Sequence, residues 1–259
     1  MTDVGFPALS PRCAAVWSRN LLVWRKLALP ALVGNFGDPL LYLLGIGYGL
    51  GAFVGDVGGM PYLTFFASGL VCASAMNTAT FESLYSAYTR MAVQRTWDSM
   101  LAAPLVVDDI VAGEALWAAT KSVFHGAIIL LVAVALGALT ASGAIVALPL
   151  LFLVGLTFAA IALVVTTLAP GYDFFTYYFT LVITPMYLFS GVFFPIDTLP
   201  PALGWVAAAL PLHHAIALLR PILVGAPSSA PLLHAGALAG YAFAFFWAAT
   251  VFARRRLID

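Results

Sequence analysis

The sequence predicts an all-α, polytopic membrane protein with six transmembrane helices, and three observations support this fold class. Hydrophobic residues make up 63% of the 259-residue chain and charged residues only 8%. Six apolar runs each approach or exceed the roughly 20 residues that a helix needs to cross the hydrocarbon core. Lys and Arg gather in alternate segments between the runs. The predicted spans, about 27–50, 62–83, 116–139, 145–168, 175–194 and 232–253, form one domain over residues 1–259.

The composition excludes several other classes of protein. An ordinary globular domain carries about 25% charged residues, so a soluble fold of this length could not bury so much apolar surface. The apolar runs lack the period-two alternation of transmembrane β-strands. The formal net charge is zero, so no global basic field would attract nucleic acid.

The positions of the basic residues predict the orientation of the helices. If the N-terminus is cytoplasmic, Arg220 is the one basic residue in an external segment, and Lys121 falls early in the third span. An excess of Lys and Arg on the cytoplasmic side is the usual bias of membrane proteins. We therefore expect both termini in the cytoplasm and the chain in the cell (inner) membrane. The remaining basic residues, all assigned to cytoplasmic segments, are Arg12, Arg19, Arg25, Lys26, Arg90, Arg95, Arg254, Arg255 and Arg256.

Two segments outside the predicted spans combine apolar and polar residues. Residues 11–26 mix Trp17 and Trp24 with basic groups. This pattern is typical of an interfacial helix lying along the membrane, although a basic flank of the first span would look similar. Residues 195–231 are rich in proline, yet they contain the apolar run 205–212. Because that run is too short to span, we expect external re-entrant helices between spans five and six.

Ionisable residues in and beside the apolar runs form a predicted intramembrane charge network. Glu114, Lys121 and His125 are spaced i, i+7 and i+11, so they share one helix face, and Glu82 ends the second span. A charge at the bilayer centre costs roughly 2.5–3.5 kcal/mol or more, so such groups are usually paired or functional. We expect Lys121 to pair with Glu82 or Glu114. A structural ion-pair network, contact with a polar substrate and proton coupling all fit this pattern.

Signatures of catalysis and of bound cofactors are missing from the sequence. Neither Lys26 nor Lys121 stands in the glycine-rich pattern of a phosphate loop, and no His-Glu-x-x-His occurs. His213 and His214 are adjacent, so on a helix they would point about 100° apart and chelate a metal poorly. We therefore expect a transport protein that is not an enzyme and has no cofactor or metal of its own. A proton-coupled secondary transporter is one alternative.

Aromatic residues cluster at the start of the fifth span. Some of them fit the aromatic belt found at membrane interfaces. The density equally fits a surface that holds a lipid or glycolipid, which makes these residues candidates for a substrate path. The candidates are Phe174, Phe175, Tyr178 and Phe179.

Several blocks of the sequence resemble one transporter family. TFESLYSAYTRM and QRTWDSML (residues 80–91 and 94–101) are similar to the second span and following cytoplasmic loop of ABC type-2 exporter permeases. PGYDFFTYYFTLVITPMYLFSGVFFPIDTLP (170–200) and LPLHHAIALLRPILVG (210–225) resemble the fifth span and external segment of its nodulation branch. The resemblance covers nearly the whole chain.

The resemblance implies the permease subunit of an ATP-driven exporter. Two copies of such a subunit form a homodimer. The homodimer binds two copies of a separate ATPase chain, which carries Mg-ATP. The nodulation branch exports lipo-chitin oligosaccharides, so an amphipathic lipid or glycolipid substrate is implied. Its path would run between the two subunits, along the first, second and fifth spans. A coupling helix after the second span would contact the ATPase, and the candidate contact residues here are Arg90, Arg95, Trp97 and Asp98.

Overall fold

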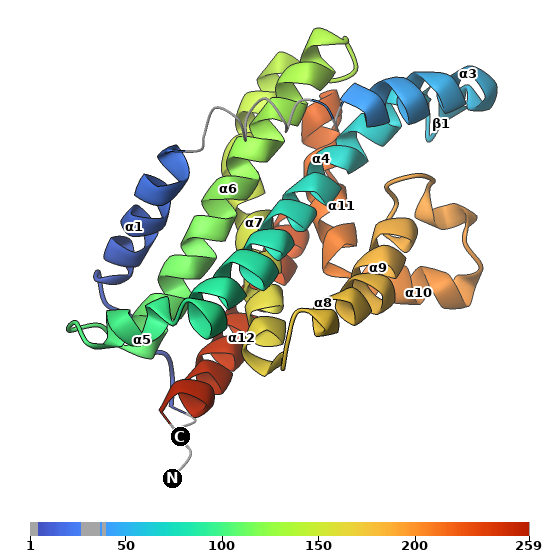
Figure 1. Cartoon of the computed structure of the whole chain (residues 1–259). Helices are drawn as coiled ribbons and strands as arrows, with labels where there is room; N and C mark the ends of the chain where they lie inside the picture. The colour runs from blue at the N-terminus through green and yellow to red at the C-terminus, as the bar shows by residue number, and fades with distance from the viewer. Residues whose placement is uncertain (1–4, 27–36, 38–39, 259) are drawn as a thin grey trace.

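The computed structural model describes residues 5–26, 37 and 40–258, and they are mostly helical (Figure 1). Within them, strands are confined to a hairpin in which β1 (Asp56–Val57) pairs antiparallel with β2 (Met60–Pro61). The predicted all-α class is therefore confirmed. The helical elements are α1 (Cys13–Arg25), η1 (Leu43–Leu50), α3 (Gly51–Val54), α4 (Tyr62–Phe81), η2 (Glu82–Ser86), η3 (Thr89–Val93), α5 (Thr96–Leu101), α6 (Val107–Ala135), α7 (Ala141–Leu168), α8 (Asp173–Tyr178), η4 (Phe179–Ile183), α9 (Thr184–Phe189), η5 (Ile196–Thr198), α10 (Pro201–Ala209), α11 (Pro211–Val224) and α12 (Pro231–Leu257).

Three long helices are apolar enough to cross a membrane. In the part of the chain that the structure describes, they are α6, α7 and α12, with 29, 28 and 27 residues. A helix of that length extends about 40 Å, which exceeds the roughly 30 Å of a hydrocarbon core. The bent pair α10 and α11 would add a fourth span if it is counted as one. The fold is that of a polytopic membrane protein, and the count of six spans stays a prediction.

Helix α7 contacts four other helices of the bundle. It packs against α4, α6, α11 and α12. Gly155 permits its close contact with α6, because a Cβ there would lie 1.9 Å from the Oγ of Ser122 and 2.9 Å from the Cα of Ala119. Small residues let membrane helices approach closely, so this glycine allows α6 to lie directly against α7.

Several helices contain turns of π-helix. In η2 the N–H of Ala87 donates to the carbonyl of Glu82, and in η4 the N–H of Thr184 donates to the carbonyl of Phe179. The turn in η4 precedes Pro185, which has no N–H to give to an α-helical ladder. π-helical turns commonly mark functional sites. Residues of both turns line one cavity of this protein.

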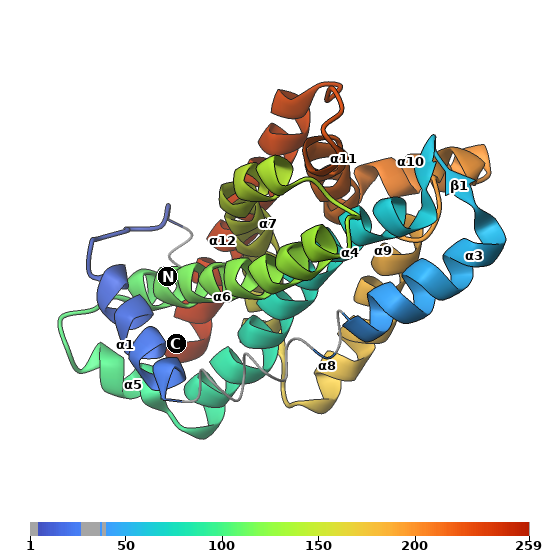
Figure 2. The same ribbon diagram turned by 90° about the horizontal axis from the view of Figure 1, so that it is seen from above.

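The two ends of the bundle differ in their elements and charges. Figure 2 shows α1, α5 and both chain termini gathered at one end, with α3, the β1–β2 hairpin and α10 at the other. Arg12 and Arg95 immediately precede α1 and α5, and Arg254–Arg256 form the last turn of α12, so the first end is strongly basic. This grouping agrees with the charge bias from which the orientation was predicted.

The observed helices differ from several of the predicted spans. The third span was predicted over 116–139, but α6 begins at Val107 because its first turn is buried and hydrogen-bonded to the N-terminal segment. The fifth span ends at Phe189, where Gly191 turns the chain with a φ of 89°. Residues 27–36 and 38–39 of the first span lie outside the described residues, whereas Leu40–Val54 is helical.

The N-terminal helix α1 packs along the first half of α6 (Figure 1). Val16 sits against Gly113, where an added Cβ would lie 2.5 Å from the Val16 Cβ. Further along, Trp17 Nε1 donates to the Oγ1 of Thr120 at 3.0 Å. The segment predicted to be interfacial is therefore a helix tied to α6 by side-chain contacts.

Helices α10 and α11 meet at an angle of 83°. The side chain of Arg220 fixes α11 to α4 and to the turn after α9. Its Nε donates to Ser68 Oγ at 2.9 Å, and its Nη2 donates to the carbonyl of Gly191 at 2.7 Å. Helix α10 lies further out, and its Trp205 is 81% exposed.

Candidate substrate cavity and charge network

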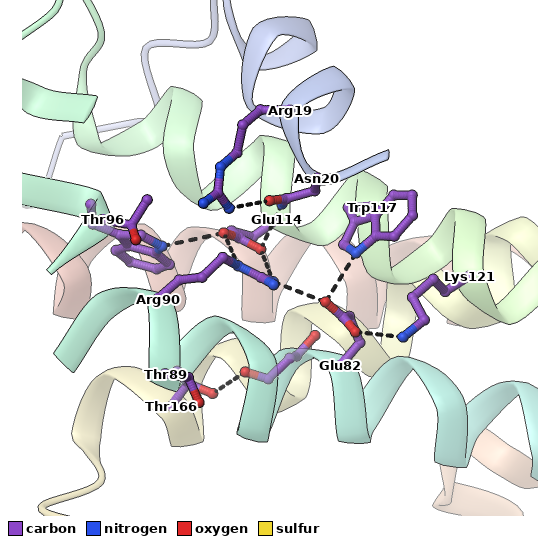
Figure 3. A network of polar contacts seen from close by, with 12 residues as sticks. Arg19, Asn20, Glu82, Thr89, Arg90, Thr96, Glu114, Trp117, Lys121 and Thr166 are labelled. Carbon is purple, nitrogen blue, oxygen red and sulfur yellow. Dashed lines mark hydrogen bonds and ion pairs between the residues drawn. The ribbon is translucent and has the colours of Figure 1, made fainter. Parts of the chain in front are cut away.

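A network of buried charged side chains joins η2, η3 and α6 (Figure 3). Glu82 is 5% exposed. Its Oε1 accepts hydrogen bonds from Arg90 Nη2 and Trp117 Nε1, both at 2.9 Å, and its Oε2 accepts one from Lys121 Nζ at 2.7 Å. Burying a carboxylate is costly unless it is paired and hydrogen-bonded, and both oxygens of Glu82 meet that condition.

Glu114 is the second carboxylate of the network and is 1% exposed. Arg90 binds it at two points, with Nε 2.9 Å from Oε1 and Nη2 2.5 Å from Oε2. Asn20 of α1 and Trp97 of α5 also donate to it, at 3.1 and 3.3 Å. Arg90 thus bridges the two carboxylates, and Glu114 links α1, α5 and α6.

The four residues predicted to contact an ATPase fall into two pairs. Arg95 and Asp98 are exposed, with side-chain exposures of 79% and 47%, and lie 3.9 Å apart. The Arg90 side chain is 12% exposed and Trp97 is fully buried. Arg90 and Trp97 both bind Glu114 inside the chain, so their side chains are turned away from solvent, and their contact with an ATPase stays a prediction. The helix continues beyond the predicted second span through η2 and η3, and this carries Arg90 back against α6.

Lys121 and His125 lie on successive turns of α6 and both line a cavity. The sequence left two partners open for Lys121, and the structure places its ammonium on Glu82. Arg90, which the sequence assigned elsewhere, connects this pair to Glu114. Three of the four predicted network residues are therefore joined through Arg90, and His125 contributes to the cavity wall.

The cavity has a volume of about 720 Å³ and opens beside the network. Cavities that hold small molecules typically measure about 300–1,000 Å³. Ser74, Asn77 and Thr78 supply polar groups from α4, and Glu82 with Lys121 forms its charged side. The cavity thus offers polar and aromatic surfaces together, as an amphipathic molecule requires. The aromatic lining residues are Trp24, Tyr42, Phe81, Tyr85, Phe124, Phe179, Tyr187 and Phe193.

The aromatic residues predicted to form a substrate path occupy different environments. Phe179 lines the cavity. Phe175 is fully buried and packs edge-on against Tyr88 with ring centroids 5.3 Å apart. Tyr178 is also buried, whereas Phe174 is 40% exposed. Phe179 is the one of the four that lines the cavity, where its ring centroid lies 4.6 Å from that of Phe81 on α4.

Comparison with known sequences shows the family. The profile of the ABC-2 type transporter family matches residues 12–224. The chain belongs to the ABC-2 type transporter family. It is 48% identical to nodulation protein J of Rhizobium leguminosarum bv. viciae over 97% of both chains. It is 45% identical to nodulation protein J of Bradyrhizobium diazoefficiens over 99% of both chains.

A more distant relative has a transport function in its name. This ABC-2 chain is 27% identical to the inner membrane transport permease YadH of Escherichia coli, over 72% of this chain and 73% of that one. The family resemblance read from the sequence motifs is therefore confirmed. The protein is a membrane transport permease.

The permease has a second charge cluster, at the beginning of α6, that was not predicted from the sequence. Arg254 Nε, from the end of α12, donates to Asp108 Oδ1 at 2.8 Å, and the N–H of Ala8 donates to Asp108 Oδ2 at 2.6 Å. Asp109 accepts from both the N–H and the hydroxyl of Ser10. Acidic residues in a first helical turn are stabilised by the helix dipole, and this signal could have marked the cluster.

Three histidines of the permease meet near the opposite end of the bundle. Nδ1 of His214 lies 3.0 Å from Nδ1 of His234, and the ring of His213 is 6.0 Å from that of His234. His234 belongs to α12, so no local spacing could have revealed this contact. Among the residues that the structure describes, no group of three or more potential ligands is arranged to hold a metal ion.

Proposed function

We propose that this permease is the membrane-spanning subunit of an ATP-driven exporter. Its substrate would be an amphipathic lipid, glycolipid or lipo-oligosaccharide that leaves the cytoplasm or the inner leaflet. The observation that best supports this substrate class is the cavity, where Asn77, Thr78 and Lys121 face aromatic side chains such as Phe81 and Phe179. A polar headgroup and an apolar tail would each find a matching surface there.

Six spans with both termini in the cytoplasm complete the proposed arrangement in the cell (inner) membrane. Helix α4 would be the second span and the continuous helix of 173–189 the fifth, while Leu40–Val54 would belong to the first. Helices α10 and α11 would enter the outer leaflet and return. The basic end formed by α1, α5 and the end of α12 supports a cytoplasmic position for these elements.

ATP binding and hydrolysis are assigned to two copies of a separate ATPase chain that carries Mg-ATP and binds a homodimer of this permease. Arg95 and Asp98 would contact it, because they are exposed at the start of α5. Trp97 anchors the same short helix to Glu114. A displacement of α5 would therefore reach the network and the cavity beside it. ATP would shift the populations of inward- and outward-open states.

The buried carboxylates support a structural role better than a proton-coupled one. Glu82 and Glu114 each accept hydrogen bonds from Arg90 and from an indole N–H, and Glu82 also binds Lys121. Protonating either carboxylate would break charge-assisted hydrogen bonds that are among the strongest in proteins. A secondary transporter would need a carboxylate that gains and loses a proton easily.

The test is transport of a fluorescent lipo-oligosaccharide by the permease and its ATPase chain in proteoliposomes. Transport should require Mg-ATP. The double variant Arg95→Asn/Asp98→Asn should hydrolyse ATP but export at least about tenfold more slowly, which corresponds to about 1.4 kcal/mol of coupling. Asn suits position 95, where φ is 51°, because it tolerates left-handed backbone.

Arg255→Asn is the matched control, because Arg255 is exposed at the same end of the bundle. It should export at the wild-type rate. Normal export by the double variant would contradict the docking assignment. Export that continues without ATP would contradict the proposed function and would favour a proton-coupled transporter.

A further inference from the structure

We propose that Lys121 binds an anionic headgroup, a phosphate or a carboxylate, in the cavity, and so selects acidic amphiphiles over neutral ones. This inference rests on the proposed function, because it takes the cavity as the substrate site. It assigns a specificity-determining role to a residue whose visible contact is an ion pair with Glu82.

The first argument is the accessibility of the ammonium group. The Lys121 side chain is 29% exposed, whereas that of its partner Glu82 is 4% exposed, and both line the cavity. An ammonium group carries three donors, and its bond to Glu82 at 2.7 Å uses one of them. Lys121 can therefore bind a second anion from the cavity side.

The second argument is that Glu82 does not depend on Lys121 alone. Its Oε1 accepts from both Arg90 and Trp117 at 2.9 Å (Figure 3). If Lys121 turns toward a ligand, Glu82 keeps a cation and an indole N–H. Turning therefore avoids the large penalty of a buried carboxylate left without any partner.

The third argument is the charge balance of the cluster. Two carboxylates, Glu82 and Glu114, stand among three cations, since Arg19 donates to Asn20 beside Glu114 while Arg90 and Lys121 bind the carboxylates directly. The cluster carries one positive charge in excess. An anion bound beside Lys121, the one of the three cations that lines the cavity, would bring the cluster to neutrality.

The fourth argument is the apolar surface beside Lys121. Phe124 lies three residues further along α6 and stacks on Trp24 with ring centroids 5.3 Å apart, and both line the cavity. A low-dielectric wall strengthens the attraction between the ammonium and an anion. The wall also provides an apolar surface against which the acyl chain of the ligand can pack. Lys121 and this wall together fit an acidic amphiphile.

The test is binding of simple amphiphiles to the purified full-length permease in a neutral detergent, followed by the change in tryptophan fluorescence, to which Trp24 in the cavity wall contributes. The probes are dodecyl phosphate, dodecanoate and neutral dodecanol. Lys121→Gln should weaken the affinity for the preferred anion at least about tenfold, because it removes a charge-assisted hydrogen bond to the headgroup. The affinity for neutral dodecanol should not change. Lys121→Arg, which keeps the charge, should retain the preference for anions. The tighter of the two anions identifies the headgroup as phosphate or carboxylate.

Lys26→Gln is the matched control, because Lys26 is the other lysine of the chain and is exposed. It should bind every probe as the wild type does. The inference would be overturned if the Lys121→Gln variant bound the anions with normal affinity. It would also be overturned if the affinity of this variant for dodecanol fell as much as its affinity for the anions. A Lys121→Arg variant that binds anionic and neutral probes equally well would also overturn it, provided that its unfolding temperature shows that the variant is folded. These results are independent of ATP, so they are separable from a failure of ATP-driven export.

Discussion

Arg90 holds together two buried carboxylates that would otherwise repel each other. Its guanidinium lies within 2.9 Å of Glu82 and 2.5 Å of Glu114, whose side chains are 4% and 1% exposed. The planar fork of arginine can bind one carboxylate at two points while reaching a second. Lysine carries its charge on one atom and cannot reproduce this geometry.

Replacing Arg90 with methionine should destabilise the permease strongly. Removing one partner of a buried ion pair commonly costs about 3–5 kcal/mol, because the remaining charge stays buried. The measurement is thermal unfolding of the purified protein in detergent. Arg255→Met removes an exposed arginine and should change stability by no more than about 0.5 kcal/mol. Equal losses in the two variants would show that the network contributes little.

At the scale of elements, glycines decide how closely helices pack. A Cβ at Gly113 would meet Val16 Cβ at 2.5 Å and the carbonyl oxygen of Cys13 at 2.7 Å. That oxygen belongs to the backbone of α1, so it cannot move without moving the helix. A Cβ at Gly236 in α12 would meet nothing within 4 Å.

Gly113→Ala should therefore displace α1 from α6. Overpacking commonly costs about 1–3 kcal/mol, which outweighs the gain of up to about 1 kcal/mol from alanine's helix propensity. Faster labelling of Cys13 by a maleimide would report the displacement, with the buried Cys72 as internal reference. Gly236→Ala should leave labelling unchanged and be neutral or stabilising. Unaltered Cys13 labelling in Gly113→Ala would mean that α1 does not need this close contact.

The pair of His214 and His234 joins the starts of α11 and α12. Their Nδ1 atoms lie 3.0 Å apart, so one must donate and the other must accept. An imidazole that carries protons on both nitrogens cannot accept a hydrogen bond. His213 adds a third imidazole within 6.0 Å of His234, and Arg220 and Tyr241 lie on the same two helices.

Acid should weaken this junction between α11 and α12. Free histidine protonates near pH 6.5, whereas two imidazoles that share a hydrogen bond cannot both be donors. The unfolded chain therefore binds more protons than the folded one below that pH, and stability falls. The thermal stability of the wild type should fall between pH 7 and pH 5 more than that of His214→Phe, which lacks the pair. The measurement is unfolding temperature against pH. Parallel pH profiles for the two proteins would exclude a role for this pair.

At the scale of the whole molecule, the two ends are held by different forces. The basic end is fastened by ion pairs, including Arg254 with Asp108, and Arg256 donates to the carbonyls of Thr167 and Ala169 at the end of α7. At the other end, two histidine rings share a hydrogen bond, and the Arg220 cation binds a hydroxyl and a carbonyl instead of a carboxylate. Hydrogen bonds that do not join opposite charges are weaker than ion pairs of good geometry, so the end with the histidine pair should open more easily.

Single cysteines in a background without Cys13 and Cys72 can test this opening. Thr198 is exposed before α10, and the apolar Val206 on α10 is 57% exposed. If α10 enters the outer leaflet, a membrane-impermeant thiol reagent should label Thr198→Cys and spare Val206→Cys. Trapping ATP on the partner chain should change labelling at position 206. Equal labelling at both positions, with or without ATP, would indicate a plain external loop.

The local sequence accounts for the fold class and for the need to pair the buried charges. Apolar runs and basic flanks depend only on neighbouring residues, so they are readable without a structure. The spacing of Glu114, Lys121 and His125 on one helix face was readable for the same reason. The acidic pair of Asp108 and Asp109 was visible as well, but nothing near it in the chain indicated that Arg254 would bind it.

The sequence by itself determined that this is an all-α membrane transport permease of the ABC-2 family, with charges that had to find partners in an apolar surrounding. Only the tertiary structure decided which partners they found. Asn20 and Glu114 are 94 residues apart, and Lys121 and Glu82 are 39 apart. Such contacts depend on how distant helices pack. Arg90 shows the same principle, because the helical segment continues from α4 through η2 and η3 and Arg90 binds Glu82 and Glu114 instead of lying in a loop.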